Sequence, residues 1–352
     1  MTTKRSIKKI PAAPSILIIL MGSLGDVARG LCLVSHIKAH RPESRITWLV
    51  EPKCADLVGL HPQIDHVIEF KRKRPVAAMR DLYQNLQKEH FDITLDLQRI
   101  LKSGFFSLLS RAKRRIGFHR KNAKELNWLF NNESIPDCDE NLPKLGHYLK
   151  FTEHLGLPEP NRLDFGLKSL DVNKLIPPAV AAIQNSFIAV VMGSSWESKD
   201  WNFEGYGQLV QHVIKNLKRH VVLLGGGDQW TVAEKQLQKA NSPNIINLTG
   251  NSLIEMTAVL KAAAAAVGPD SGPGHLAAAV GTPYVTLFGP TPASRHVPYG
   301  CEHLIVQSGL DCAPCYQRQC PDRNNQCMQN IELDDVVEKI SMALEDAARL
   351  KD

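Results

Sequence analysis

The stretch VGPDSGPGHLAAAVGTPYVTLFGPT, residues 267–291, decides the fold of this chain. An apolar run ends at Val267 and enters a loop rich in Gly and Pro. A helix of small residues is predicted at 275–280, and Gly281 begins the turn into a strand at 284–288. The order is strand, loop, helix, strand, which is the unit of parallel α/β sheets.

The loop of this stretch predicts an anion-binding site. The first N–H groups of a helix have no partner in the helix, and the helix dipole favours an anion in front of them. Gly272 and Gly274 lack a Cβ and so allow close approach of a ligand. Asp270 would repel a phosphate, so we expect it to cap the loop or to bind hydroxyl groups. Because Pro273 has no N–H, the available donors are the N–H groups of Ser271, Gly272, Gly274 and His275. A plain βαβ connection is the alternative.

The rest of the chain repeats this alternation. Residues 15–21 form a continuous apolar run, as in a strand buried on both faces, and a helical pattern follows at 27–39. The periodicity lapses between about Pro158 and Pro178, which predicts an interdomain connection, and restarts with a strand at 187–192. A length of 352 residues suits two domains. We therefore predict two doubly wound, Rossmann-like α/β domains, at 1–170 and 178–333.

Charge is distributed unevenly between the two predicted domains. Residues 1–175 hold 29 Lys and Arg against 19 Asp and Glu, a balance of +10, whereas the remainder holds 13 against 17, or −4. A basic first half predicts a polyanionic partner for that half, with chance clustering of solvated charges as the alternative. Basic residues concentrate at 71–74 and 111–121. No aromatic residues interleave with them as in a nucleic-acid stacking platform, so we expect no nucleic-acid partner.

The start of the chain resembles a signal peptide in having Lys4, Arg5, Lys8 and Lys9 ahead of an apolar run at 16–21. The run is short and passes directly into Gly-Ser-Leu-Gly-Asp without a small-residue cleavage site. A buried first strand is the better interpretation. We expect a cytoplasmic protein, either free or resting on the inner face of the inner membrane.

Polar residues follow several predicted strands, at the carboxyl ends where open α/β sheets bind ligands. Asp26 follows the first strand, and its alternative role is to cap the next helix. Lys199 lies in the segment MGSSWESKDW, residues 192–201, which otherwise reads as an exposed turn. Asp228 ends the run Gly225-Gly226-Gly227-Asp228, where a plain turn competes with a contact to ribose hydroxyls. No Gly-x-Gly-x-x-Gly fingerprint occurs, which disfavours a dehydrogenase.

Four of the eight cysteines, Cys312, Cys315, Cys320 and Cys327, lie within sixteen residues. Their spacing is compatible with a structural metal, with disulfides or with plain thiols, and it is not a standard zinc spacing. A cytoplasmic location disfavours disulfides. We treat the four as a structural cluster and assign no catalytic metal or cofactor.

These motifs resemble those of glycosyltransferase family 9, the ADP-heptose:lipopolysaccharide heptosyltransferases. Asp-Ser-Gly-x-x-His at 270–275 is similar to the family's Asp-Thr-Gly-x-x-His, with Ser271 in place of threonine. Residues 21–27 resemble the start of the family, although Cys32 stands where a proline is common. Residues 193–201 resemble its Gly-small-small…Lys-x-Trp segment, and 96–98 and 112–118 resemble its acceptor half. The resemblance runs from Ile16 to about Ile331.

The resemblance implies roles for these residues. Asp26 would be the catalytic base, since an inverting transfer removes a proton from the acceptor hydroxyl as it attacks the anomeric carbon. Lys199 would stabilise the charge that grows on the departing diphosphate. The residues implied in donor binding are Ser194, Ser195, Lys199, Asp228, Asn251, Asp270, Ser271, Gly272, Gly274 and His275. Those implied in binding an anionic acceptor are Arg114, Arg115 and Arg120.

The resemblance implies the GT-B architecture, in which the two doubly wound domains face a central cleft. The function implied is an inverting, metal-independent heptosyltransferase. It would move a heptose from ADP-L-glycero-β-D-manno-heptose to an inner-core acceptor of lipopolysaccharide. In related two-domain transferases the last helix, here 334–352, packs back on the first domain. Two alternatives remain at this stage: a GT-B transferase that uses another sugar nucleotide, and a non-catalytic protein that binds a nucleotide sugar or nucleic acid.

Overall fold

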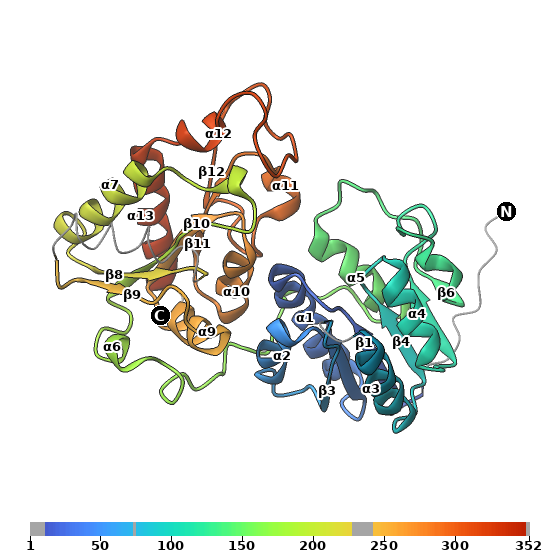
Figure 1. Ribbon diagram of the computed structural model, residues 1–352. Coiled ribbons are helices and arrows are strands. Elements are labelled where there is room, and N and C mark those ends of the chain that lie inside the picture. The colour runs from blue at the N-terminus through green and yellow to red at the C-terminus, as the bar shows by residue number, and fades with distance from the viewer. Residues whose placement is uncertain (1–10, 73–74, 227–241, 350–352) are drawn as a thin grey trace. The chain divides into compact units, whose positions relative to one another are not determined.

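The computed structural model describes residues 11–72, 75–226 and 242–349. The chain divides into two compact units, residues 1–167 and 168–352 (Figure 1). Each unit is built around one six-stranded sheet in which every strand pair is parallel. The fold class is therefore the predicted one, with two doubly wound α/β units.

The first unit has the strand order β3-β2-β1-β4-β5-β6. Its elements are β1 (Ser15–Ile19), α1 (Leu24–His40), β2 (Arg45–Val50), α2 (Pro52–Gly59), β3 (His66–Glu69), α3 (Pro75–Gln87), β4 (Ile93–Asp96), α4 (Leu101–Leu109), β5 (Arg114–Gly117), the 3₁₀ helix η1 (Asn127–Leu129), β6 (Glu133–Ser134) and α5 (Lys144–His154).

The second unit has the strand order β12-β11-β10-β7-β8-β9. Its elements are α6 (Pro178–Ala181), β7 (Phe187–Val191), the 3₁₀ helix η2 (Glu197–Lys199), α7 (Phe203–Lys215), β8 (His220–Leu224), β9 (Ile245–Asn247), α9 (Leu253–Ala262), β10 (Ala265–Pro269), α10 (Gly272–Val280), β11 (Tyr284–Phe288), α11 (Ala293–His296), β12 (Ile305–Gln307), α12 (Gln326–Gln329) and α13 (Leu333–Arg349).

Both sheets reverse their strand order at one place. In the first unit the reversal lies between β1 and β4, and in the second it lies between β7 and β10. In open α/β sheets the loops that leave such a switch point diverge, and ligands bind in the space they leave at the carboxyl ends of the strands. We therefore expect the ligand-binding residues in the loops after these four strands.

Two helices begin earlier than their apolar periodicity predicts. The helix expected at 27–39 starts at Leu24, because Ser23 is its N-cap and pairs with Asp26 in a capping box. The helix expected at 275–280 starts at Gly272, because Pro273 is tolerated in a first turn whose N–H groups are unpaired in any case. Both changes bring a predicted site residue into the first turn of a helix.

The C-terminal helix α13 is packed within the second unit, and its packing back on the first domain stays a prediction. In the structure α13 belongs to the second unit and packs against β10, β11, β12 and α7 (Figure 1). Its buried residues are Val336, Ile340 and Ala343, which lie on one side of the helix. The apolar stripe of the helix is therefore used within its own unit.

The apolar run near the start of the chain is β1, whose last four residues are fully buried between β2 and β4. This is the buried first strand that the sequence predicts. Within the described part of the chain, none of the helices combines the length and the hydropathy that crossing a bilayer requires.

Candidate active site

Asp26 lies in the first turn of α1, directly after the central strand β1. Its Oδ2 accepts hydrogen bonds from the backbone N–H of Ser23 at 3.3 Å and from the Ser23 hydroxyl at 3.0 Å. Asp26 therefore does cap α1, which was the alternative role predicted for it, because its carboxylate completes the capping box with Ser23. Capping also fixes the carboxylate at the carboxyl end of β1.

The second carboxylate oxygen of Asp26 is held by three side chains. Oδ1 accepts from Arg29 Nη2 at 2.9 Å, from Lys144 Nζ at 3.3 Å and from the Tyr148 hydroxyl at 3.2 Å. Lys144 and Tyr148 are one helical turn apart on α5, which packs on α1. The sequence reasoning missed α5 and both residues, although the apolar spacing of Leu145, Tyr148 and Phe151 after Pro143 was a helix signal.

These neighbours set the charge of Asp26. Burial opposes ionisation, but the Arg29 and Lys144 cations and the hydrogen bonds from Arg29 and Ser23 outweigh it and hold the pKa of Asp26 well below its usual range. Asp26 is therefore a carboxylate at every physiological pH and is able to accept a proton.

Gln98 fixes the loop that leads into α1. It follows β4, and its Oε1 accepts from Met21 N at 2.8 Å while its Nε2 donates to Gly22 O at 2.9 Å. Asp96, at the end of β4, is fully buried and accepts from Asn127 Nδ2 at 2.6 Å. The Asp-Leu-Gln segment therefore ties the two strands of the switch point together through side chains.

In the second unit Lys199 and Asp270 form one buried ion pair. Lys199 Nζ donates to Asp270 Oδ2 at 2.7 Å and to its backbone oxygen at 3.2 Å, and Thr291 Oγ1 donates to the same Oδ2 at 2.7 Å. Burial opposes ionisation of Asp270, but the Lys199 cation keeps the pKa of Asp270 below its usual value. Asp270 thus anchors the lysine, which joins the loop after β7 to the loop after β10.

The N-terminus of α10 lies directly beside this pair. Ser271 is the N-cap, and its buried hydroxyl makes no capping hydrogen bond to α10 but interacts with the Tyr284 side chain. The Gly274 N–H, one of the predicted donors, turns back to Ser271 O at 3.2 Å. Gly272 is half-buried at the first position of the helix, and His275 is buried. Of the four N–H groups predicted to bind an anion, that of Gly274 therefore already has a hydrogen-bond partner in the loop.

Gly274 has a different reason to be glycine than ligand approach. A Cβ at this position would lie 2.7 Å from the ring of Tyr284. The glycine lets α10 pack closely on β11, and this packing places the helix N-terminus beside Lys199. Ligand approach at Gly274 stays a prediction beside this packing role.

The loop after β7 is held by short hydrogen bonds. Ser194 N donates to Asp200 Oδ1 at 2.8 Å, and its Oγ donates to Trp196 O at 2.9 Å. Ser195 is exposed. Lys199 Nζ lies 4.5 Å and the Arg318 guanidinium 5.5 Å from the centroid of the Trp196 ring, so two cations lie against one aromatic ring. Ser194 shapes the loop, and Arg318 is an additional cation that sequence reasoning missed.

Two further predicted donor residues follow strands of this unit. Asn251 is half-buried in the loop between β9 and α9, next to Ser252, the N-cap of α9. Asp228 lies outside the described residues.

The three predicted acceptor arginines differ in their burial and their partners. Arg114 is only 9% exposed and binds Glu133 through Nε at 2.9 Å and Nη2 at 2.6 Å. Arg115 donates to the carbonyls of Phe130 and Ala112, each at 3.1 Å. Both guanidinium groups therefore make hydrogen bonds inside the unit, and their role in acceptor binding stays a prediction. Arg120 is exposed and lies over the Trp128 ring.

The cysteine segment forms a loop with free thiols. Cys312 and Cys315 are exposed, Cys320 is half-buried and Cys327 is buried. Across the described ranges, no three Cys, His, Asp or Glu side chains converge as metal ligands would.

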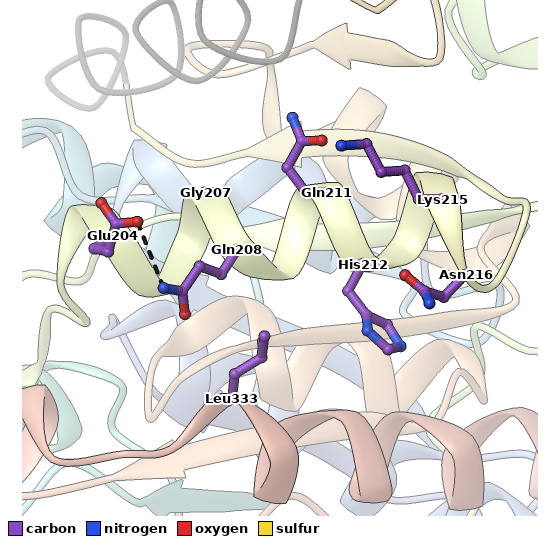
Figure 2. A pocket seen from close by; sticks show the side chains of 8 residues that line it. All are labelled: Glu204, Gly207, Gln208, Gln211, His212, Lys215, Asn216 and Leu333. Carbon is purple, nitrogen blue, oxygen red and sulfur yellow. Dashed lines mark hydrogen bonds between the residues drawn. The ribbon is translucent and has the colours of Figure 1, made fainter.

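A surface hollow of the second unit lies along α7 and is unrelated to these groups. It is lined by seven residues of α7 and its end together with Leu333 at the start of α13 (Figure 2). The residues are Glu204, Gly207, Gln208, Gln211, His212, Lys215, Asn216 and Leu333. None of the predicted site residues is among them.

Comparison with known proteins agrees with this picture. The Haemophilus influenzae protein named lipopolysaccharide core heptosyltransferase OpsX is 27% identical over 295 residues, covering 82% of each chain. Lipopolysaccharide heptosyltransferase 1 of Pseudomonas aeruginosa is 27% identical over 317 residues, covering 87% of each. Among solved structures, Escherichia coli heptosyltransferase WaaC with ADP superposes with a TM-score of 0.78 at 20% identity, covering 94% of this chain and 99% of that one.

These similarities extend over both units, and the fold is the GT-B fold of the solved heptosyltransferases. Residues 79–325 match the family pattern described as glycosyltransferase family 9 (heptosyltransferase), which is more than half of the chain. On that match and on the motifs at its two switch points, this chain belongs to glycosyltransferase family 9, the heptosyltransferases.

Proposed function

We propose that this protein transfers a heptose, with inversion, from ADP-L-glycero-β-D-manno-heptose to an inner-core acceptor of lipopolysaccharide. The observation that carries the proposal is the placement of the ionised Asp26 and of Lys199 with the α10 N-terminus at the two switch points. Relatives named as lipopolysaccharide heptosyltransferases support the choice of donor and acceptor.

Asp26 is proposed as the general base. As the acceptor oxygen forms its bond to the anomeric carbon, its proton passes to the Asp26 carboxylate, and the bond from that carbon to the donor phosphate breaks. ADP leaves with the electron pair of the broken bond. The charge balance requires one proton acceptor and one site that tolerates a growing anion, and the two switch points supply one each.

The second unit is proposed to hold the nucleotide diphosphate. The dipole of α10 and the ammonium of Lys199 favour the charge that develops on the leaving group. The Ser271 hydroxyl is buried beside the Tyr284 side chain at the start of α10, and we propose that it donates to a phosphate oxygen. Accordingly, we assign the donor to the second unit and the acceptor to the first.

The contacts of Asp26 add a requirement to this mechanism. Its two oxygens already accept from five donor atoms, whereas a carboxylate offers about four lone-pair directions. An acceptor hydroxyl must therefore displace one donor. Among the three donors to Oδ1, Lys144 is the most accessible, because its side chain is 37% exposed while that of Arg29 is 8% exposed and Tyr148 is buried. We propose that an anionic group of the acceptor draws Lys144 away from Asp26.

The acceptor is proposed to be an anionic, lipid-linked sugar at the inner face of the inner membrane. The basic balance of the first half of the chain supports this, as does Lys144 beside the proposed base. Arg120 is the member of the predicted acceptor group whose exposure leaves it available.

The test is transfer by the purified full chain from a panel of ADP-, UDP- and GDP-sugars, with the variant Asp26→Asn beside the parent. We expect transfer from ADP-heptose and a decrease in kcat of about 10²–10⁴ for the variant, the usual contribution of a general base. ADP affinity, measured by calorimetry, should stay near that of the parent. Preference for another sugar nucleotide would overturn the donor assignment, and near-normal turnover of Asp26→Asn would remove Asp26 from the mechanism.

A further inference from the structure

Exposed apolar side chains of the first unit are concentrated on two segments that are close in space. Leu101, Phe105 and Leu108 recur at intervals of four and three on α4, which is the spacing of one helix face. Leu126, Trp128 and Leu129 are exposed in and beside η1. We call these six residues the α4–η1 surface. Exposed apolar residues are common singly, but a contiguous group indicates an interaction site.

The two segments form one rigid surface. Asn127 Nδ2 donates to Ile100 O at 2.8 Å, Lys124 N donates to Arg99 O at 2.8 Å, and Leu101 N donates to Glu125 Oε2 at 3.3 Å. Such bonds hold η1 against the start of α4, and the Phe105 and Phe130 rings meet edge to face, 6.2 Å apart. The apolar side chains are thus presented by folded backbone.

Positive charge surrounds the same surface. Between residues 99 and 130 the sequence holds nine Lys and Arg and one acidic residue, Glu125. The exposed members of this set are Arg111, Lys113, Arg120, Lys121 and Lys124. Arg120 lies over the Trp128 ring at 5.4 Å, which pairs a cation with the indole at the edge of the surface. Tryptophan, leucine and arginine side by side are typical of a membrane interface.

The charge distinguishes between possible partners. A second copy of this chain in a twofold dimer would place each basic rim against its own counterpart, which is repulsive. An anionic bilayer accepts both features, because its headgroup phosphates attract the cations and its acyl boundary takes up leucine, phenylalanine and tryptophan.

We propose that the α4–η1 surface docks the protein on an anionic phospholipid bilayer. This proposal rests on the proposed function in one respect: docking would bring the enzyme to a lipid-linked acceptor. Docking itself needs neither heptose nor acceptor, so it is tested without them.

The experiment is sedimentation of the full chain with vesicles of phosphatidylcholine alone and of phosphatidylcholine mixed with phosphatidylglycerol. We expect binding to the mixed vesicles, weakened by salt, and a blue shift of tryptophan fluorescence that Trp128→Phe reduces. The double variant Leu126→Ser/Leu129→Ser and the single variant Phe105→Ser should lower the partition coefficient, the double variant by about tenfold.

The matched control is Phe203→Ser, because Phe203 of α7 has the same 38% exposure as Phe105 but lies in the other unit. It should bind the mixed vesicles like the parent. Thermal melts show whether each variant is folded. Transfer of heptose to a water-soluble acceptor tests the transferase proposal independently of membrane binding. Equal vesicle binding by the surface variants and the parent would overturn the proposal. So would absence of binding by the parent, or self-association of the parent that the surface variants abolish.

Discussion

At the scale of single residues, the proposed site depends on carboxylates held by cations. Asp26 is bound by Arg29 and Lys144, and Asp270 by Lys199. A carboxylate held in this way stays ionised, but each cation also lowers its affinity for a proton. A base restrained by three side chains on one oxygen is well positioned and weak, so releasing one of them has a direct chemical effect.

Lys144→Met tests this release. Removing the cation removes a stabilising partner of the ionised form, so the pKa of Asp26 should rise toward its ordinary value. Since the base acts when ionised, kcat/KM of the variant should begin to fall at a higher pH than that of the parent as the pH is lowered. Rates measured from neutral pH down to about pH 2, through the range in which an ordinary aspartate titrates, report this shift.

The control for that profile is Lys150→Met, on the same helix but paired with the exposed Glu153. Its profile should match the parent's. If Lys144→Met and the parent lose activity at the same pH, Lys144 does not influence the base.

At the scale of elements, close packing of α10 on β11 sets the donor end of the second unit. The backbone of Gly274 meets Tyr284, whose hydroxyl donates to Pro269 O at 3.2 Å, at the end of β10. The helix, the strand behind it and the loop between them therefore hold one another in place.

Gly274→Ala should destabilise the protein by about 1–3 kcal/mol, because the added methyl has no room beside the Tyr284 ring. Urea unfolding of the variant checks the magnitude. Gly309→Ala is the matched control, since nothing lies within 4 Å of a Cβ at that glycine. A Gly274→Ala protein as stable as the control would show that α10 has freedom to move away from β11.

A second element contact is the pair formed by Arg114 of β5 and Glu133 of β6. The hydrogen bond from Arg114 outweighs burial and, with that from His154, lowers the pKa of Glu133 to about 2. Because the folded pKa lies below the unfolded value, the pair stabilises the fold above about pH 4.5, and this contribution is lost as the pH falls toward about 2.

Arg114→Met should therefore lower the free energy of unfolding by about 2 kcal/mol near neutral pH and by less at about pH 3. Urea titrations at both pH values measure the two differences. Lys113→Met, a neighbouring exposed cation, should be nearly neutral at each. A deficit for Arg114→Met that does not shrink in acid would show that the residue acts through packing alone.

At the scale of the whole molecule, charge separates the two halves of the chain. The first 175 residues carry a balance of +10 and the remainder −4. Exposed charges are screened over roughly 8 Å at physiological ionic strength, whereas the buried Lys199 and the backbone N–H groups of α10 are screened less. Binding of an acceptor and binding of a donor should thus respond differently to salt.

Raising the salt concentration should increase the KM of the acceptor more than that of the donor, and Arg120→Glu should have the same selective effect. Initial rates against each substrate at low and high salt measure both. Lys215→Glu, an exposed change in the second unit, is the charge-matched control and should leave the acceptor KM unchanged. Equal salt sensitivity for the two substrates would contradict a charge-driven acceptor site.

The sequence by itself determined the alternation of strands and helices, the division near residues 158–178 and the residues after β1, β7 and β10. Apolar runs, glycines and prolines act over a few residues, so their pattern is readable along the chain. It also identified the family, whose motifs are continuous segments.

The tertiary structure alone decided which distant side chains meet. Lys144 and Tyr148 reach Asp26 across 118 and 122 positions, and Lys199 reaches Asp270 across 71. Tertiary packing also gives the cations of the basic run 111–121 different surroundings. Arg114 pairs with the partly buried Glu133, whereas Arg120 is exposed. A local pattern states that a residue is charged, but its partner depends on how α5, β6 and the loops pack. That packing is set by burial of apolar faces over the whole unit.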